Sequence, residues 1–149
     1  MNRHLEFTVR RADWHDDGAA LRDVRKAVFV DEQHVPEELE WDGVDEQCVH
    51  VIAEAATGEA IGTGRLLPDG HVGRMAVLAD WRRRGVGSLL LAELLIAARD
   101  RGHGVIELSA QTHALGFYRR CGFEVVSAEY LEAGIAHRSM RLPLLTPRE

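Results

Sequence analysis

A short segment rich in glycine and arginine carries the clearest chemistry in this sequence. Residues 82–88 read RRRGVGS, between an expected strand and an expected helix. A helix N-terminus leaves backbone N–H groups unpaired and carries partial positive charge, so it attracts anions. Glycines let the backbone approach phosphate oxygens, and the arginines and Ser88 add charge-assisted donors. The segment predicts a phosphate-bearing ligand, or alternatively a tight turn with solvated arginines.

Two other phosphate-binding motifs fit this segment poorly. A P-loop requires a Lys directly after its second glycine, and no Lys follows Gly85 or Gly87. The dinucleotide fingerprint requires three glycines and a later acidic residue, whereas only Gly85 and Gly87 are present. A nucleotide-binding protein of another class is therefore the weakest alternative.

The elements that position this segment are expected to form one domain, residues 1–149. Alternating or apolar stretches predict strands at residues 6–10, 49–55, 60–67, 72–78, 105–110, 125–126 and 138–142. Helical spacing predicts helices at 14–29, 85–101 and 114–121, the first of them capped by Asp13. The acidic segment 31–46 is expected to be a loop or a short helix. Because antiparallel strands cluster before the long helix, this order predicts an α/β or α+β sandwich.

Composition narrows the class of protein. Hydrophobic residues make up 46% of the chain and charged residues 28%, and two cysteines are too few for a disulfide framework. The first residues lack the apolar stretch of a signal peptide and no run reaches the length of a membrane span, so a cytoplasmic protein is expected. A net charge of −6 argues against nucleic-acid binding. The histidines lack metal-ligand spacing, so no metal is expected.

The charge is distributed unevenly along the chain. Residues 1–73 carry 7 Lys/Arg and 16 Asp/Glu, whereas residues 74–149 carry 11 and 8. Ten carboxylates and no Lys or Arg lie between Lys26 and Arg65. The first half can attract a cationic ligand and the second an anionic one, or the acidic residues only keep the surface soluble.

Two motifs together resemble the signatures of the GNAT (GCN5-related) N-acetyltransferase superfamily. Residues 82–88, which follow the strand GRMAV, match its Gln/Arg-x-x-Gly-x-Gly/Ala pattern. The later stretch LSAQTHALGFYRRCGF at 108–123 is similar to the family's strand, its Asn-x-x-Ala and its Phe-Tyr-x-x-x-Gly-Phe. Narrower matches, to the ElaA/YjcF-like branch, lie at 28–36, 62–66 and 132–140. The resemblance implies the GNAT acyl-CoA N-acyltransferase fold, a central mixed, mostly antiparallel sheet flanked by helices.

The resemblance also implies acetyl-CoA as co-substrate. The strand before the loop would pair its backbone with the pantetheine arm, and the loop would hold the pyrophosphate. The implied donor-binding residues are Met75, Ala76, Val77, Arg82, Arg84, Gly85, Val86, Gly87, Ser88, Gln111, Ala114 and Tyr118. Gln111 departs from the family, which usually has Asn there, so its contact is the less certain one.

The implied activity is transfer of an acetyl group to a primary amine of a small molecule, peptide or protein, by direct attack in a ternary complex. Tyr118 would protonate the leaving thiolate, or it would only pack the short helix against the sheet. The backbone N–H of Val77 would stabilise the oxyanion. The strand at 72–77 lacks the Glu that many relatives use as general base. Candidates for the base elsewhere are Glu32, His137, His50, Asp42 and Asp45.

The acceptor side remains open at the level of sequence. The acidic stretch at 31–46 favours a cationic amine. Arg65 and Arg74, on neighbouring strands, either hold a substrate carboxylate or pair with internal acids. The missing strand carboxylate supports another function, a non-catalytic acyl-CoA-binding or sensing module. The resemblance also leaves a homodimer open, because many GNAT proteins form dimers. No feature of this sequence shows an interface.

Overall fold

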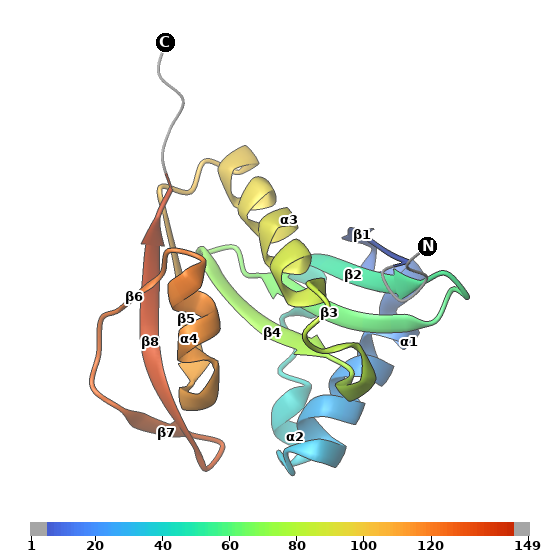
Figure 1. Cartoon of the computed structure of the whole chain (residues 1–149), viewed down its shortest axis with the longest axis horizontal. Helices are drawn as coiled ribbons and strands as arrows, with labels where there is room; N and C mark the ends of the chain where they lie inside the picture. Colours follow the sequence, from blue (N-terminus) through green and yellow to red (C-terminus); the bar gives the residue numbers. More distant parts are fainter. Residues whose placement is uncertain (1–5, 145–149) are drawn as a thin grey trace.

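The computed structural model describes residues 6–144, which form an eight-stranded sheet with helices on both faces (Figure 1). The strands follow the order β1-β2-β3-β4-β5-β8-β6, and β7 pairs with β8. They are β1 (Phe7–Ala12), β2 (Val49–Ala55), β3 (Ala60–Leu66), β4 (His71–Val77), β5 (Val105–Gln111), β6 (Glu124–Val125), β7 (Tyr130–Glu132) and β8 (Ile135–Pro143). All neighbours are antiparallel except β4 and β5. The predicted mixed, mostly antiparallel sheet is confirmed.

The first helix begins where the sequence predicted and extends further. Asp13 caps it by accepting hydrogen bonds from the N–H groups of His15 (2.7 Å) and Asp16 (3.2 Å). Helix α1 (Trp14–Arg25) then widens into a π-helical segment, Lys26–Glu32. A π-helical turn is uncommon and is often found near a functional site. The remaining helices are α2 (Glu37–Glu40), α3 (Val86–Asp100) and α4 (Leu115–Arg120).

Helices α1 and α3 cover opposite faces of the sheet. Leucines of α3, among them Leu90 and Leu94, belong to the main core with Val51 and Ile61 of the central strands. The α1 side forms a separate cluster around Val24. Burial of these apolar side chains on both faces provides the main driving force for the fold. Within residues 6–144, no helix has the length and apolar character needed to span a bilayer.

The start of β4 pairs with the middle of β5, and the two strands then separate (Figure 1). Their ladder joins His71 to Glu107 and Val72 to Leu108, and among the described residues it extends no further. At the same point the β3–β4 register shifts, and Arg74 takes a left-handed φ of 49°. A β-bulge of this kind bends a strand and increases its twist. The rest of β4 therefore diverges from β5 and leaves a backbone edge facing the gap.

The acidic segment, predicted as a loop or a short helix, contains the short helix α2 and a 3-10 turn, Asp45–Gln47. The sequence prediction missed β7, which forms a tight hairpin with β8. Three exposed or half-buried residues give too short a pattern to be detected by alternation.

Candidate functional site

The glycine-arginine loop opens α3 as predicted. Gly85 has a φ of 87°, a conformation that favours glycine, and stands directly before the first residue of α3. Gly87 lies within the helix, and a Cβ added there would meet only the Phe117 ring, at an ordinary 3.4 Å. Neither backbone geometry nor packing thus requires glycine at position 87. Gly87 therefore leaves the backbone of the first helical turn uncovered by a side chain.

A cavity of about 850 Å³, the loop-side cavity, runs along this helix start. Its lining combines the outer part of β4, the loop and the start of α4. The lining residues that were also predicted as donor-binding are Met75, Ala76, Val77, Arg82, Gly85, Val86, Gly87, Ser88, Gln111, Ala114 and Tyr118. Val86, Gly87 and Ser88 belong to the first turn of α3, where backbone N–H groups lack helical partners. The cavity therefore has an anion-binding end and an open strand edge.

The arginines of the loop have different environments. Arg84 was predicted at the pyrophosphate, but its guanidinium lies 5.0 Å from the centre of the Trp81 ring, and Arg84 does not line the cavity. Arg83 and Arg120 do line it, and the sequence analysis did not select them. The three successive arginines gave no means of telling which side chains face the cavity.

Arg82 is held by two partners rather than projecting freely. Its Nε donates to the backbone oxygen of Val77 at 2.8 Å. Its two terminal nitrogens bind both carboxylate oxygens of Glu32 at 2.7 and 2.8 Å. These hydrogen bonds lower the pKa of Glu32. A carboxylate with a lowered pKa is a weaker base, and Glu32 lines only the loop-side cavity, so the contacts favour a structural role for it.

A second cavity, of about 360 Å³, lies on the other side of the gap between β4 and β5. We call it the hairpin-side cavity, because the β7–β8 hairpin lines it through Glu132, Ala133, Ile135 and His137. The two cavities share the lining residues Gln33, Met75, Gln111, His113, Ala114, Tyr118 and Ile135. A ligand in one can therefore meet a ligand in the other across this shared set.

Tyr118 lies in the shared lining and is also part of the core. Its side chain packs edge-on against Phe117 and Phe123, and only 8% of it is exposed. Burial raises the pKa of Tyr118 above its ordinary value, so its hydroxyl keeps its proton at neutral pH. The contacts show the packing role, whereas the acid role stays a prediction, because a raised pKa also makes the hydroxyl a weaker acid.

Gln111, at the end of β5, is fixed by a contact across the sheet gap. Its Nε2 donates to Oε1 of Gln33 at 2.8 Å, which links β5 to the residue that ends the π-helical segment. The Gln111 side chain, one methylene longer than the Asn usual in the family, thus reaches a partner on the opposite side of the gap. Gln33 was not selected from the sequence, because these two positions are far apart along the chain.

His137 has the geometry of a proton acceptor at the hairpin-side cavity. Its Nδ1 lies 2.7 Å from the carbonyl oxygen of Ile135, and a carbonyl can only accept a hydrogen bond. Nδ1 therefore carries the proton, and Nε2 keeps a lone pair in the neutral ring. The side chain is 6% exposed and its ring stacks on that of Tyr130. Among the candidate bases, His137 is the one that both faces this cavity and has an available lone pair.

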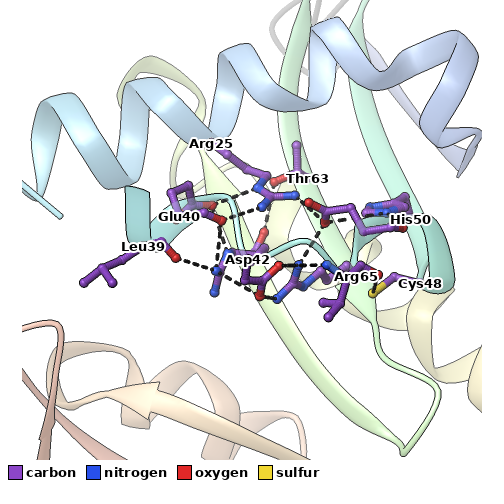
Figure 2. Close-up of polar contacts among 11 residues, drawn as sticks. Arg25, Leu39, Glu40, Asp42, Cys48, His50, Thr63 and Arg65 are labelled. Carbon is purple, nitrogen blue, oxygen red and sulfur yellow. Dashed lines mark hydrogen bonds and ion pairs between the residues drawn. The ribbon is translucent and has the colours of Figure 1, made fainter. Parts of the chain in front are cut away.

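The other candidate bases belong to a buried network, which we call the arginine–carboxylate cluster (Figure 2). Its members are Arg25, Glu40, Asp42, Asp45, Arg65 and Arg74, with His50 at its edge. Arg25 binds Glu40 and Asp45, each at 2.8 Å. Arg65 donates to Asp45 at 2.8 Å and, through both terminal nitrogens, to Asp42.

These contacts make the cluster carboxylates poor bases. The hydrogen bonds from Arg65 lower the pKa of Asp42 to about 2. Burial alone would raise the pKa of Asp45, but Arg25 and Arg65 outweigh it and lower that pKa. His50 donates from Nε2 to the carbonyl of Asp45, and burial lowers its pKa. None of these three side chains lines either cavity.

The cysteines have the environment expected of unreactive thiols. Burial raises the pKa of both Cys48 and Cys121, so each keeps its proton at neutral pH. Cys48 donates to the carbonyl of Val44 at 3.3 Å. Among residues 6–144 no group of His, Cys, Asp or Glu side chains is arranged to hold a metal ion.

Comparison with known proteins agrees with this architecture. The family model described as an acetyltransferase (GNAT) domain matches residues 11–144. A Bacillus subtilis (strain 168) protein named uncharacterized N-acetyltransferase YjcF is 39% identical over 121 residues, which cover 78% of this chain and 86% of that protein. An acyl-CoA N-acyltransferase from Pseudomonas aeruginosa has 32% identity and a TM-score of 0.80, with 91% of this chain and 99% of that chain covered. Escherichia coli ElaA has 27% identity and a TM-score of 0.80, covering 91% and 98%. The resemblance inferred from the two motifs is confirmed.

Proposed function

Because the chain belongs to the GNAT acetyltransferase family, we propose that it moves an acetyl group from acetyl-CoA to a primary amine by direct attack in a ternary complex. The observation that carries this proposal is the pair of cavities that meet at a shared set of residues, among them Met75, Gln111 and Tyr118. Two substrates held side by side in this way react as if in one molecule, which supplies much of the rate acceleration.

The loop-side cavity suits the donor. The amides at the start of α3 and the side chains of Arg83 and Arg120 offer hydrogen bonds and positive charge to a pyrophosphate. The free edge of β4 offers its backbone to the pantetheine arm, and Met75 leads that arm to the shared lining. Arg82 acts indirectly here, because its ion pair with Glu32 ties the loop to the π-helical segment.

The hairpin-side cavity suits the acceptor. His137 is placed to take a proton from the incoming ammonium through Nε2, directly or through water. The amine can then attack the thioester carbonyl, with the N–H of Val77 as the donor to the developing oxyanion. Tyr118, which stays protonated, would give its proton to the departing thiolate. The nitrogen of the tetrahedral intermediate must also lose a second proton, which can return to Tyr118 through water once Tyr118 has protonated the thiolate. No covalent acyl-enzyme is needed.

The test is release of free CoA from acetyl-CoA over a panel of primary amines, with mass spectrometry of the products. We expect at least one amine to be acetylated well above the rate of acetyl-CoA hydrolysis. If acetyl-CoA binds, as shown by calorimetry, and no amine is turned over, the chain is instead a non-catalytic acyl-CoA-binding module.

A further inference from the structure

Two buried nitrogens in the hairpin-side cavity wall have no hydrogen-bond partner. Among the described residues, the buried side-chain polar atoms in this condition are Nε of Arg65 and Nε of Arg74, and both side chains line this cavity. Nε of Arg74 lies 2.9 Å from Oε2 of Glu40, but it is not aligned to donate to it. A buried donor left without an acceptor costs about 1–3 kcal/mol. The cluster, otherwise densely hydrogen-bonded, is therefore incomplete at the two arginines whose side chains line the cavity.

Arg74 is the arginine of the cluster that remains within reach of a ligand. Its side chain is 23% exposed, against 1% for Arg25 and 4% for Arg65. In a regular strand, successive side chains point to opposite faces, yet Gly73, Arg74 and Met75 all line the hairpin-side cavity. The bulge at Arg74, with its φ of 49°, makes this possible. Backbone strain of about 1–3 kcal/mol at a non-glycine residue is typical of ligand sites.

The guanidinium of Arg74 lies beside the carboxylates of Glu40 (2.9 Å) and Asp42 (3.3 Å). Burial lowers the pKa of Arg74, and the positive charges of Arg65 and Arg25 lower it further, while Glu40 and Asp42 act in the opposite direction. Arg65 differs, because its hydrogen bonds to Asp42 and Asp45 outweigh burial and raise its pKa. Both arginines have partners within the cluster, but only Arg74 is exposed enough, at 23% against 4% for Arg65, to meet a ligand anion as well.

The wall of the hairpin-side cavity that is formed by the β7–β8 hairpin carries a carboxylate, that of Glu132. Glu132 lies at the β7–β8 turn, where Ala133 and Gly134 have φ values of 52° and 76°. Two successive positive φ values are typical of the tight turn that joins hairpin strands. The Glu132 carboxylate accepts a hydrogen bond from Ser109 at 3.3 Å, and no arginine or lysine ion pair is formed by it among the described residues. The cavity thus has an arginine on β4 and a carboxylate on the hairpin.

We propose that the acceptor carries a compact oxyanion, a carboxylate or a phosphate, which Arg74 binds with Arg65 beside it, while its amino group faces Glu132 and His137. This inference rests on the function proposed above and narrows its substrate to small zwitterionic amines such as amino acids or amino phosphates. The volume of about 360 Å³ agrees with a small acceptor, since ligand pockets span roughly 300–1,000 Å³. It also revises the cationic acceptor expected from the acidic segment, because three of that segment's carboxylates, Glu40, Asp42 and Asp45, are paired with arginines.

The experiment compares amines that differ only in the anionic group. Each standard amino acid is paired with its carboxamide, and ethanolamine phosphate with ethanolamine. Acetylation rates are measured for the wild type, Arg74→Gln, Arg74→Lys and the control Arg141→Gln, an exposed residue of β8 that lines neither cavity. The same pairs are titrated by calorimetry into protein saturated with CoA, so that binding is seen without turnover. Circular dichroism checks the fold of each variant.

We expect the best acceptors to exceed their uncharged partners by about 30-fold or more in kcat/KM, the effect of removing one partner of a buried charge pair. Arg74→Gln should reduce this preference to less than about threefold, Arg74→Lys should keep part of it because it keeps the charge, and Arg141→Gln should keep all of it. A preference within the amino acid pairs would identify the anion as a carboxylate, and a preference for ethanolamine phosphate over ethanolamine would identify it as a phosphate.

Equal rates within every pair would overturn the inference while leaving the acetyltransferase proposal intact. Absence of turnover, with binding that discriminates the pairs in the wild type but not in Arg74→Gln, would support the anion site and overturn the proposed function. Absence of discrimination in both rate and binding overturns the anion site. If Arg74→Gln does not fold, Arg74→Lys and the wild-type comparison decide.

Discussion

The two cavities on either side of the sheet gap are built in different ways. The loop-side cavity comes largely from two continuous stretches, residues 75–88 and 111–120. The hairpin-side cavity instead draws on α2, β3, β4, β5 and the β7–β8 hairpin. A helix start and a strand edge have the same chemistry wherever they occur, so the first cavity can be encoded in short motifs. The second depends on which distant side chains the fold brings together.

The ion pairs near the two cavities differ in how far they are exposed to solvent. Glu32 and Arg82, on the loop side, are 45% and 39% exposed, so water and salt weaken their interaction. Arg25, Glu40 and Asp45 are almost fully buried, so each needs its partners to avoid an unpaired charge in the interior. Disruption of the cluster should therefore destabilise the whole fold, whereas disruption of the exposed pair should have only a local effect at the loop-side cavity.

The largest effect is expected from breaking the cluster. Arg25→Met leaves Glu40 and Asp45 each without one buried partner, which should lower the free energy of unfolding by about 3–5 kcal/mol. Urea unfolding followed by circular dichroism measures it. Arg11→Met, which removes an exposed pair with Glu93, is the control and should cost less than about 1 kcal/mol. An equal decrease in the free energy of unfolding in both variants would show that the cluster does not stabilise the fold.

Removing the hydroxyl at the shared lining should affect turnover and not donor binding. Tyr118→Phe keeps the edge-on packing against Phe117 and Phe123 but cannot protonate a thiolate. We expect kcat to fall by about 10²–10³, in the range of general acid catalysis, with the Kd for CoA within about twofold. Tyr130→Phe, which removes a hydroxyl bonded to Ser109, is the matched control and should change kcat far less. An unchanged kcat in Tyr118→Phe would exclude its acid role.

Replacement of His137, the candidate base in the hairpin-side cavity, should slow turnover. His137→Gln removes the Nε2 lone pair, so kcat should fall by about 10², again without loss of CoA affinity. Calorimetry with CoA and circular dichroism should show an intact donor site and fold. His103→Gln lines neither cavity and serves as the control. A kcat equal to that of the wild type would move the base to another residue.

The smallest effect is expected at the exposed pair. Glu32→Gln removes a negative charge from the loop-side cavity and frees Arg82 for the donor, so CoA affinity should rise by about two- to fivefold at low salt. The kcat should change by less than about twofold. Stopped-flow turnover and calorimetry in two salt concentrations measure both quantities. A loss of kcat near 10² would instead restore Glu32 as the general base.

Much of the fold could be predicted from local patterns. The Asp13 cap, the long helix at 85–101 and the strands around it all came from periodicity and turn residues, which reflect interactions within a few positions. The β7 strand was missed because it is short and lies largely exposed at the sheet edge. The π-helical turn was missed because the apolar spacing of an ordinary helix and of one with a widened turn is nearly the same over so few residues.

The sequence by itself determined the elements that line the loop-side cavity, because a glycine-rich helix start, a strand before it and an aromatic motif after it are contiguous features. Only the tertiary structure decided the partners of its charges. It joined Glu32 to Arg82 and Gln33 to Gln111, and it left Arg74 facing a cavity with an unsatisfied nitrogen. Electrostatic interactions act over a few ångströms in space, regardless of separation along the chain, so no pattern of nearby residues reveals which acid neutralises which base.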